Sequence, residues 1–577
     1  MPLRRAAWAS SAVVVLAVAW LVATTLLARA QLLRAEARIA TIRGGFAGPV
    51  DVDTARELRA AQHEARRART LTVGPVWWAA ERLPLVGRDA RGIRRITATA
   101  EALARTTVPD VLAAKDELLD ASGSGNRFDL TVFARVERRL ARVERQVAVA
   151  HSAITGRAAP LLPAVGSAYR DVGRELAALR RQVRTLADAT RVAPAMLGVA
   201  GPRRYFVAFQ NNAELRATGG LIGSYAIVRA DHGVVSLEKV ASNAELRSPD
   251  RPIIDLGPEY DARYRGFAGD YLWSAVNLTP HYPAVNRIIT ALYAHQGGGR
   301  VDGSVSTDPV ALSYLLGVTG PAQLRSGEVV SADNVVALTL RDAYARFAAD
   351  DSARKQFLTE VARAAFAKVL SPALDRRRLL GALVLAVAEG RLLAASNHPA
   401  EQAVLEVTTV GGALDRAGGP FLHVVTQNAG GNKLDYYLHR EIRYHAYARR
   451  DQQRVVDVEV RLTNGVPAET LPPVVTGRLD APRGPILPGQ SRLYLSVYAS
   501  RGAELLNAVV DGTAIATESA VEQTHPVFSA YVEVKPRSTT TIVLRFRDPA
   551  SAGGGWRPTV RPQPLVVNDR VEVRVDN

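Results

Sequence analysis

The spacing of apolar residues changes along this chain, and each change predicts a different kind of structure. Residues 6–28 carry no charge and are long enough to cross a bilayer as one helix. In residues 31–198 apolar side chains recur at steps of three and four, which predicts a helical stalk or bundle. One such seam is Val136, Leu140, Val143, Val147, Ala150 and Ile154.

The second half of the chain has two further patterns. In residues 199–402 short apolar runs are interleaved with helical stretches, which predicts an α/β head. In residues 403–577 apolar residues alternate with polar ones, which predicts an antiparallel β-sandwich. The predicted fold class is therefore a multidomain α+β protein, with residues 1–30 as a cytoplasmic tail and transmembrane anchor.

The N-terminal apolar run has two interpretations. It is longer than the apolar part of a signal peptide, which favours a retained anchor. Ala28-Arg29-Ala30 resembles a small-x-small cleavage site, so a cleaved signal is the alternative. Two arginines precede the run, and a short basic tail normally stays inside. We therefore expect a single-pass protein of the cell membrane with the bulk of the chain extracytoplasmic.

The amino-acid composition of the chain limits the classes of partner that we expect it to bind. The net charge of +17 favours anionic partners, such as membrane lipids or a lipid-linked glycan or wall polymer. No zinc-finger, helix-turn-helix or RNA-recognition pattern is present, so nucleic acid is not expected. The absence of cysteine excludes disulfides and thiol chemistry. The helical stalk either packs on itself or offers a surface to a protein partner.

A dense polar stretch, residues 210–220, is predicted to be a loop, because it follows one predicted strand and precedes another. Ligands of α/β domains bind at such strand ends. Arg216 can hold a phosphate through its fork of donors, and a glycine pair lets backbone N–H groups approach an anion. The alternative is a tight polar turn that satisfies itself. The candidate residues are Asn211, Asn212, Glu214, Arg216, Thr218, Gly219 and Gly220.

A second candidate stretch lies on two predicted helices near residues 331–347 and 352–370. It combines cationic side chains with a carboxylate, which suits a diphosphate bridged by Mg²⁺. Mg²⁺ is the only cofactor that this pattern predicts, with Asp351 as its ligand. The alternative is that these are solvated helix faces. The residues concerned are Arg341, Arg346, Asp351, Arg354 and Gln356.

Three long motifs carry a resemblance to a known family. They begin at Arg203 (RRYFVAFQNNAELRATGGLIGSYAIV), Val301 (VDGSVSTDPVALSYLLGVTGPAQL) and Asn428 (NAGGNKLDYYLHREI). The chain resembles an actinobacterial membrane-anchored family known as domain of unknown function 4012. This resemblance covers about residues 200–350 and implies no biochemical activity.

A more distant resemblance is to the LytR-CpsA-Psr family, which transfers wall glycopolymers from a lipid diphosphate carrier. It implies diphosphate binding by Arg216, Thr218, Arg247, Arg341, Arg346, Arg354 and Gln356. The chain departs from that pattern where the family has an aspartate after its first arginine and an intact S-I-P-R-D turn. Binding of a lipid-linked polymer without turnover is therefore an alternative to catalysis.

Two functions remain open on the sequence alone, and no standard catalytic motif decides between them. The first is a transferase of polyprenyl-diphosphate-linked glycopolymers, in which Glu214 or Asp351 binds Mg²⁺ or acts as a base. The second is a non-catalytic scaffold or carrier for envelope polymer assembly. Convergence of Arg216 and Arg354 in the folded head would favour the first.

Overall fold

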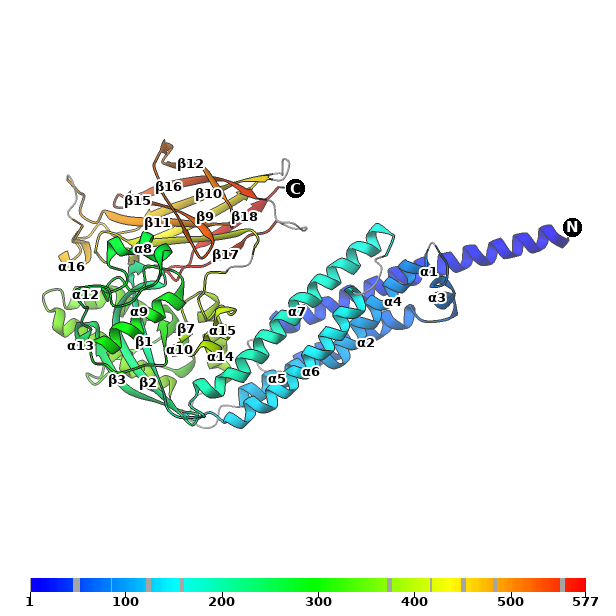
Figure 1. The fold of residues 1–577 in the computed structure, drawn as a ribbon, viewed down its shortest axis with the longest axis horizontal. Coiled ribbons are helices and arrows are strands. Elements are labelled where there is room, and N and C mark those ends of the chain that lie inside the picture. Colours follow the sequence, from blue (N-terminus) through cyan, green and yellow to red (C-terminus); the bar gives the residue numbers. More distant parts are fainter. Residues whose placement is uncertain are drawn as a thin grey trace. The chain divides into compact units, whose positions relative to one another are not determined.

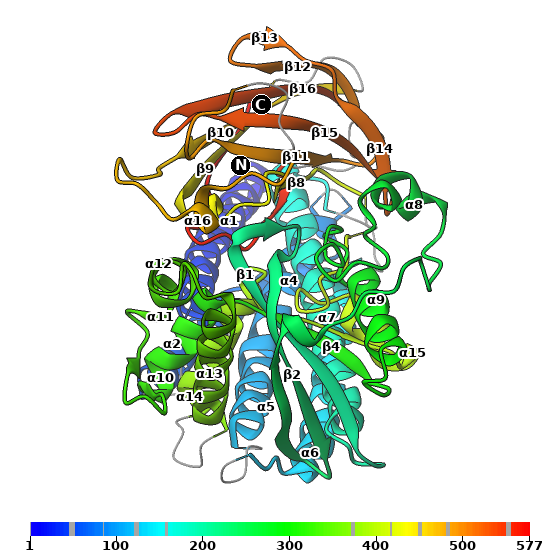
Figure 2. The same ribbon diagram turned by 90° about the vertical axis from the view of Figure 1, so that its left-hand side faces the viewer.

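The computed structural model describes residues 2–44, 52–84, 86–120, 126–155, 160–370, 376–415, 418–447, 453–480, 485–549 and 556–576. The chain forms two compact units. The smaller unit is helical and comprises residues 1–123, 128–194 and 376–380. The larger unit comprises residues 124–127, 195–375 and 381–577 and holds the sheets. Figures 1 and 2 show the elements of each unit.

The helical unit follows the heptad pattern. Its buried seam includes Val143 and Val147 of one helix and Leu176 and Val183 of another, so these two helices pack through a common core. Its elements are α1 (Pro2–Gly44), α2 (Val52–Leu71), α3 (Pro75–Ala80), α4 (Gly87–Ala102), the π-helical turn η1 (Leu103–Thr107), α5 (Val108–Asp120), α6 (Leu130–Thr155) and α7 (Pro163–Met196).

Helix α1 contains the apolar N-terminal run. Among the described residues, Leu16–Ile42 forms one helix long and apolar enough to cross a membrane, with a mean hydropathy of 1.7. By length and composition it fits either a single membrane span or a signal sequence. The prediction of an N-terminal apolar helix is confirmed at this level.

The larger unit begins with a mixed five-stranded sheet in the order β3-β2-β1-β4-β7. Strand β1 pairs antiparallel with β2 and parallel with β4, so Tyr205 lies between Val228 and Gly303. Short apolar runs predicted strands that overlap β1, β2, β3 and β4, whereas β7 was not expected from the sequence. The strands are β1 (Arg203–Arg216), β2 (Gly219–Asp231), β3 (Val234–Ser242), β4 (Gly303–Thr307) and β7 (Leu393–Ser396).

Helices cover both faces of this sheet (Figure 2). Phe206 packs on one face against Ile288 and Leu292 of α9, and Val207 on the other face lies in a core with Ala362 of α13. The elements are η2 (Asn243–Glu245), α8 (Pro258–Tyr264), η3 (Arg265–Phe267), α9 (Tyr282–His295), α10 (Pro309–Thr319), β5 (Ala322–Gln323), β6 (Val329–Val330), α11 (Val335–Ala337), the π-helical turn η4 (Leu338–Asp342), α12 (Ala343–Arg346), α13 (Asp351–Val369), α14 (Arg376–Ala388) and α15 (Pro399–Glu406).

Two further sheets follow, in the orders β13-β12-β16-β10-β9-β18 and β14-β15-β11-β8-β17. Leu493 and Phe528 of the second sheet lie in the same core as Val458 and Leu544 of the first. The strands are β8 (Phe421–Asn428), β9 (Leu438–Ala446), β10 (Gln453–Asn464), β11 (Ser491–Ala499), β12 (Glu504–Val510), β13 (Thr513–Ala514), β14 (Glu518–Glu522), β15 (His525–Val534), β16 (Thr539–Pro549), β17 (Thr559–Arg561) and β18 (Arg570–Val575), with η5 (Leu434–Tyr437) and α16 (Pro473–Thr476) between them.

The expectation of purely antiparallel pairing is wrong for these sheets. Strand β17 joins β8 in parallel, and β18 joins β9 in parallel. The combination of helices and sheets that was predicted for the chain is confirmed, whereas its division into four domains stays a prediction. Residues on either side of position 402 share cores, because Leu215 and Tyr344 pack with apolar side chains of the C-terminal segment.

Candidate functional site

The polar stretch expected as a loop is the end of a strand. Strand β1 continues to Arg216, with register shifts after Phe209 and after Asn211. Asn212 and Glu214 are buried, which a solvent-facing loop does not require. The strand persists through polar sequence because buried partners elsewhere in the unit satisfy its side chains.

Gly219 and Gly220 have a packing role that the sequence did not indicate. A Cβ on Gly220 would lie 1.9 Å from the Asn211 carbonyl oxygen. Gly219 has a φ of +140°, and a Cβ there would lie 2.2 Å from Gln210 Oε1. The glycine pair therefore lets the two strands close on each other at the hairpin end.

Three of the predicted polar residues form internal hydrogen bonds. Thr218 Oγ1 accepts from Gln210 Nε2 at 3.0 Å and from Asn277 Nδ2 at 3.1 Å. Asn212 Nδ2 donates to Asp308 Oδ2 at 3.0 Å. Asn211 Nδ2 donates to Tyr344 Oη at 2.6 Å, which ties β1 to α12.

A chain of contacts joins Arg216 to Arg354. Arg216 Nη2 lies 3.5 Å from Glu214 Oε1, and the other oxygen of Glu214 is paired with Lys433. The Lys433 ammonium and the Arg354 guanidinium both lie over the Tyr344 ring, 6.0 Å and 4.8 Å from its centroid. We call these five residues the cation cluster.

The guanidinium of Arg216 is held by the fold as well as by Glu214. Its Nε donates to the carbonyl of Ser274 at 3.0 Å, and Nη1 donates to the carbonyls of Leu215 at 2.9 Å and Asn428 at 3.5 Å. Its side chain is 12% exposed. Arg216 thus has a fixed position at the edge of the cluster, with most of its donors already used.

A buried carboxyl lies beside the cation cluster. Asp435 Oδ2 accepts from the Leu215 backbone N–H and from Asn428 Nδ2, both at 2.8 Å. Burial raises the pKa of Asp435 to about 7, and the nearby charge of Glu214 acts in the same direction, against these two hydrogen bonds and the charge of Arg216. Burial also raises the pKa of Tyr344 to about 12. Asp435 is therefore half-protonated near neutral pH.

The other predicted arginines are dispersed. Arg247 is exposed after β3. Arg341 pairs with the adjacent Asp342, and Arg346 pairs with Glu328 at 2.8 Å between Nη1 and Oε2. Gln356 is exposed on α13, where its amide lies 3.5 Å from Ser352 Oγ. Of the predicted diphosphate ligands, the contacts thus link Arg216 and Arg354.

Asp351 was the predicted metal ligand. It is exposed at the start of α13, and its carboxylate pairs with Arg354 and Lys355. These cations hold the pKa of Asp351 below its usual range, against the opposing effect of partial burial. Mg²⁺ prefers several oxygen ligands, and two cationic partners on one carboxylate do not fit that preference. The surroundings of Asp351 therefore do not fit a bound Mg²⁺, and Mg²⁺ binding elsewhere stays a prediction.

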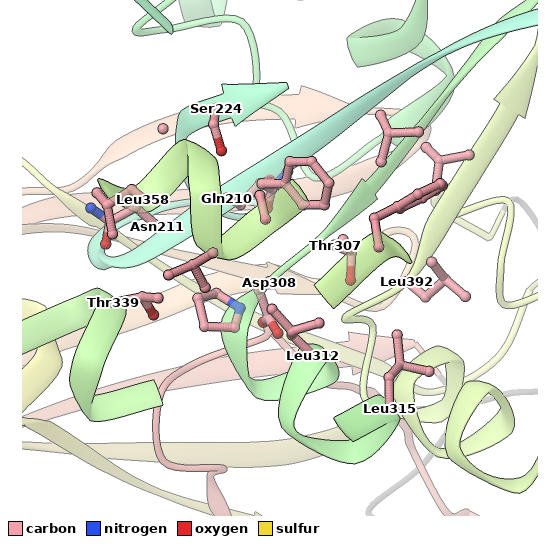
Figure 3. Close-up of a pocket in the computed structure, with 18 of the residues that line it drawn as sticks. Gln210, Asn211, Ser224, Thr307, Asp308, Leu312, Leu315, Thr339, Leu358 and Leu392 are labelled. Carbon is pink, nitrogen blue, oxygen red and sulfur yellow. The ribbon is translucent and has the colours of Figure 1, made fainter. Parts of the chain in front are cut away.

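An apolar cavity of about 320 Å³ lies on the α13 face of the five-stranded sheet (Figure 3). Its walls come from β1, β2 and β4 and from α10, α13 and α14. Most of its lining is aliphatic or aromatic, and its volume lies in the usual range for ligand pockets of about 300–1,000 Å³. The lining apolar residues include Val207, Phe209, Leu312, Leu315, Leu358, Val361, Phe366 and Leu383.

The polar residues of the cavity are spread over its wall. In Figure 3, Asn211 and Thr339 lie toward one side of the view, Thr307 and Asp308 lie near its middle, and Leu315 and Leu392 lie toward the other side. Asn211 is also the residue that bonds Tyr344 in the cation cluster. A residue that lines the apolar cavity is therefore hydrogen-bonded directly to a residue of the cation cluster.

Sequence reasoning missed the residues that complete this arrangement. Lys433 and Asp435 lie in the motif NAGGNKLDYYLHREI, which the sequence marks only through its resemblance to a family. Tyr344 lies in the stretch predicted as helix near residues 331–347, where the sequence assigns it no role. The motif itself was a possible signal, because a lysine and an aspartate flank a leucine between two glycines and two tyrosines. Nothing in the local sequence, however, links that segment to residues 211–216.

The comparisons identify one segment of the chain. Residues 200–344 match the family model DUF4012. That family is described as "Protein of unknown function (DUF4012)". The match confirms the first resemblance over this segment and lends no support to the LytR-CpsA-Psr resemblance or to an actinobacterial source.

No curated protein matches the chain. Among solved structures, the chain is similar to a "putative nutrient binding protein" from Legionella pneumophila, with 8% identity and a TM-score of 0.15. That similarity covers 23% of this chain and 44% of the Legionella chain, less than half of its length.

Proposed function

We propose that this protein is a membrane-anchored, extracytoplasmic component of the cell envelope that binds polyprenyl-diphosphate-linked glycopolymers. The observation that supports this proposal most is the apolar cavity of about 320 Å³, whose lining residue Asn211 is hydrogen-bonded to Tyr344 of the cation cluster. In this proposal the isoprenoid chain fills the cavity and the diphosphate lies near the cluster.

The cavity supports an apolar chain as its occupant. Residues such as Leu312, Val361 and Phe366 offer no hydrogen bonds, so a polar ligand would lose its hydration there without compensation. A hydrocarbon chain gains roughly 0.8 kcal/mol for each methylene that leaves water. A linear or branched hydrocarbon is therefore the ligand class that the lining favours.

The cation cluster supports an anionic head group. Arg216 and Lys433 both contact Glu214, Arg354 pairs with Asp351, and the adjoining Asp435 loses about half of its negative charge near neutral pH by its raised pKa. The excess of positive charge attracts a phosphate. Lys433 is suited to move from Glu214 to a phosphate oxygen because its ammonium is on a flexible stem.

The N-terminal helix and the charge of the chain fit a lipid ligand. Retention of α1 as an anchor would keep the larger unit at the membrane, where polyprenyl carriers reside. The net charge of +17 would further favour an anionic lipid surface. We place the bulk of the chain outside the cytoplasm because the short N-terminal tail carries two arginines.

Binding without transfer is the form of the proposal that the geometry favours. Arg216 already donates to three backbone carbonyls, and Arg346 and Arg341 pair with carboxylates of their own surroundings. A transferase needs donors that are directed at the reacting phosphate. A carrier or scaffold for lipid-linked polymers requires only recognition of the lipid and its head group.

Two neighbouring residues of α14 provide a matched test. Leu383 lines the cavity, whereas Val384 is 50% exposed and does not line it. We expect Leu383→Trp in the full detergent-solubilised chain to weaken binding of geranylgeranyl diphosphate about tenfold, because the indole occupies space that the chain needs. Val384→Trp should bind like the wild type.

Native mass spectrometry or fluorescence titration measures the affinity of both variants for the ligand. Titrations with geranylgeraniol and with inorganic diphosphate measure separately how the lipid half and the head-group half of the ligand bind. Lys433→Met should weaken binding of geranylgeranyl diphosphate while leaving geranylgeraniol unaffected. Equal affinities of the two tryptophan variants, with both folded, would show that the cavity is not the lipid site.

A further inference from the structure

A second hollow in the larger unit has aromatic walls. It has a volume of about 340 Å³ and lies between residues of η3 and the strands β8, β11 and β15. We call it the aromatic cleft and define it by Phe267, Gln427, Arg492, Tyr494 and Tyr531. The arrangement of these side chains differs from that of an ordinary surface depression.

The rings of the cleft form a row. Tyr494 and Tyr531 are cross-strand partners of β11 and β15, and their ring centroids are 4.9 Å apart. Phe267 continues the row, with its centroid 5.9 Å from that of Tyr494. Phe267 and Tyr531 are each 43% exposed. Neighbouring rings are inclined to each other by 54° and 53°, so they form a platform of separately tilted faces, on each of which a partly apolar ligand can stack.

Charged groups fix one edge of the platform. The Arg492 guanidinium lies 4.4 Å from the centroid of Tyr531, and its Nη1 donates to Asp480 Oδ2 at 2.7 Å. Arg478 holds the same carboxylate from another side. Because Asp480 has two arginine partners, this edge is rigid and presents both donors and acceptors to a ligand.

A buried acceptor in the wall has no partner. Gln427 is 5% exposed, and its Oε1 has no hydrogen-bond partner in the part of the chain that the structure describes. A buried polar atom without a partner is costly, so such atoms usually serve a purpose. Gln427 lines the cleft, so its amide can contact a ligand there.

We propose that the aromatic cleft binds hexopyranose units of a glycan. A pyranose ring has an apolar C–H face that stacks on aromatic rings and a rim of hydroxyls that bond to amides, carboxylates and guanidinium groups. Phe267, Tyr494 and Tyr531 provide the platform, whereas Gln427, Asp480 and Arg492 provide the partners of the hydroxyls.

The position of the cleft adds a sugar-binding site to the proposed function. The inference that the bound glycan belongs to a lipid-linked polymer rests on that proposed function. Arg216 belongs to the wall of the cleft and to the cation cluster. The apolar cavity, the cluster and the cleft thus follow one another in the order of lipid, diphosphate and sugar.

Soluble oligosaccharides test the cleft independently of lipid. We would titrate the full chain in detergent with chitotetraose, mannotetraose and galactotetraose and follow saturation-transfer NMR and calorimetry. At least one should bind, and Tyr531→Ala should weaken it about tenfold through the lost ring contact. Tyr447→Ala is the control, since Tyr447 lies after β9 outside the cleft.

Gln427→Leu separates recognition from folding. It removes an acceptor that has no partner in the protein, so the melting temperature should hold or rise while the glycan affinity falls. Failure of all three oligosaccharides to bind at millimolar concentration would overturn the inference, as would equal affinities of the Tyr531→Ala and Tyr447→Ala variants. Geranylgeranyl diphosphate binding, measured on the same preparation, shows separately whether the proposed lipid site stands.

Discussion

Substituting Asp435 by asparagine tests the electrostatics at the centre of the candidate site. Asp435 is 2% exposed, and its pKa is raised from the usual 3.8 to about 7, chiefly by burial. An asparagine carbonyl can accept the same hydrogen bonds from Leu215 and Asn428 that Asp435 Oδ2 accepts. The substitution therefore removes the titration while keeping the shape.

The sign of the pH effect follows from proton binding. Between about pH 4 and pH 7 the folded chain retains the proton on Asp435, whereas the unfolded chain has lost it. The contribution of Asp435 to the free energy of unfolding therefore falls as pH rises through this range and changes no further above about pH 7. From pH 5 to pH 8 the loss is roughly 3 kcal/mol, because the folded chain holds one extra proton over about two pH units.

Thermal unfolding of the larger unit measures this loss. An unfolding entropy of about 2.1 cal/mol/K per residue converts 3 kcal/mol to roughly 4 °C for a unit of this size. The melting temperature of the wild type should therefore fall about 4 °C further than that of Asp435→Asn between pH 5 and pH 8. Asp548, whose pKa burial raises to about 6, leaves the variant some pH dependence. Identical pH profiles for the two proteins would refute the raised pKa of Asp435.

Three further predictions concern stability and location. Arg391→Met should lower the free energy of unfolding by about 3–5 kcal/mol in a denaturant titration, because it leaves Asp308 buried without the guanidinium that lies 2.9 Å away; an unchanged midpoint would contradict this. Gly220→Ala should destabilise by at least about 1 kcal/mol, since its Cβ meets the Asn211 carbonyl, whereas Gly223→Ala, with its nearest atom at 3.9 Å, serves as the control. The expressed chain should stay in the membrane pellet after a carbonate wash if α1 is a retained anchor, and a soluble chain lacking residues 1–30 would show cleavage instead.

The periodic parts of the fold could be predicted from the sequence because local burial decides them. Val143 and Val147 of the heptad seam are buried, and in β10 the alternation places Val456 and Val458 in the core. Each such element carries its pattern within a few residues, so no knowledge of distant contacts is needed.

The candidate site could be predicted only in part because its residues are satisfied by distant segments. Glu214 meets Lys433, and Asn211 meets Tyr344. Polar residues in a strand resemble a loop until the buried partners are known, which explains why residues 210–216 were expected as one. The parallel pairing of β17 and β18 leaves no local signal either, since parallel neighbours come from remote parts of the chain.

Photo-cross-linking of a polyprenyl phosphate with a diazirine at the end of its chain tests the central claim most directly. The full chain would be irradiated in detergent with this probe, digested and mapped by mass spectrometry. The proposal predicts cross-links to α10 and α13 at cavity residues such as Leu312, Leu315 and Phe366, and their loss in Leu383→Trp but not in Val384→Trp. Cross-links confined to α1, or to surface residues outside the cavity, would contradict a lipid site within the fold.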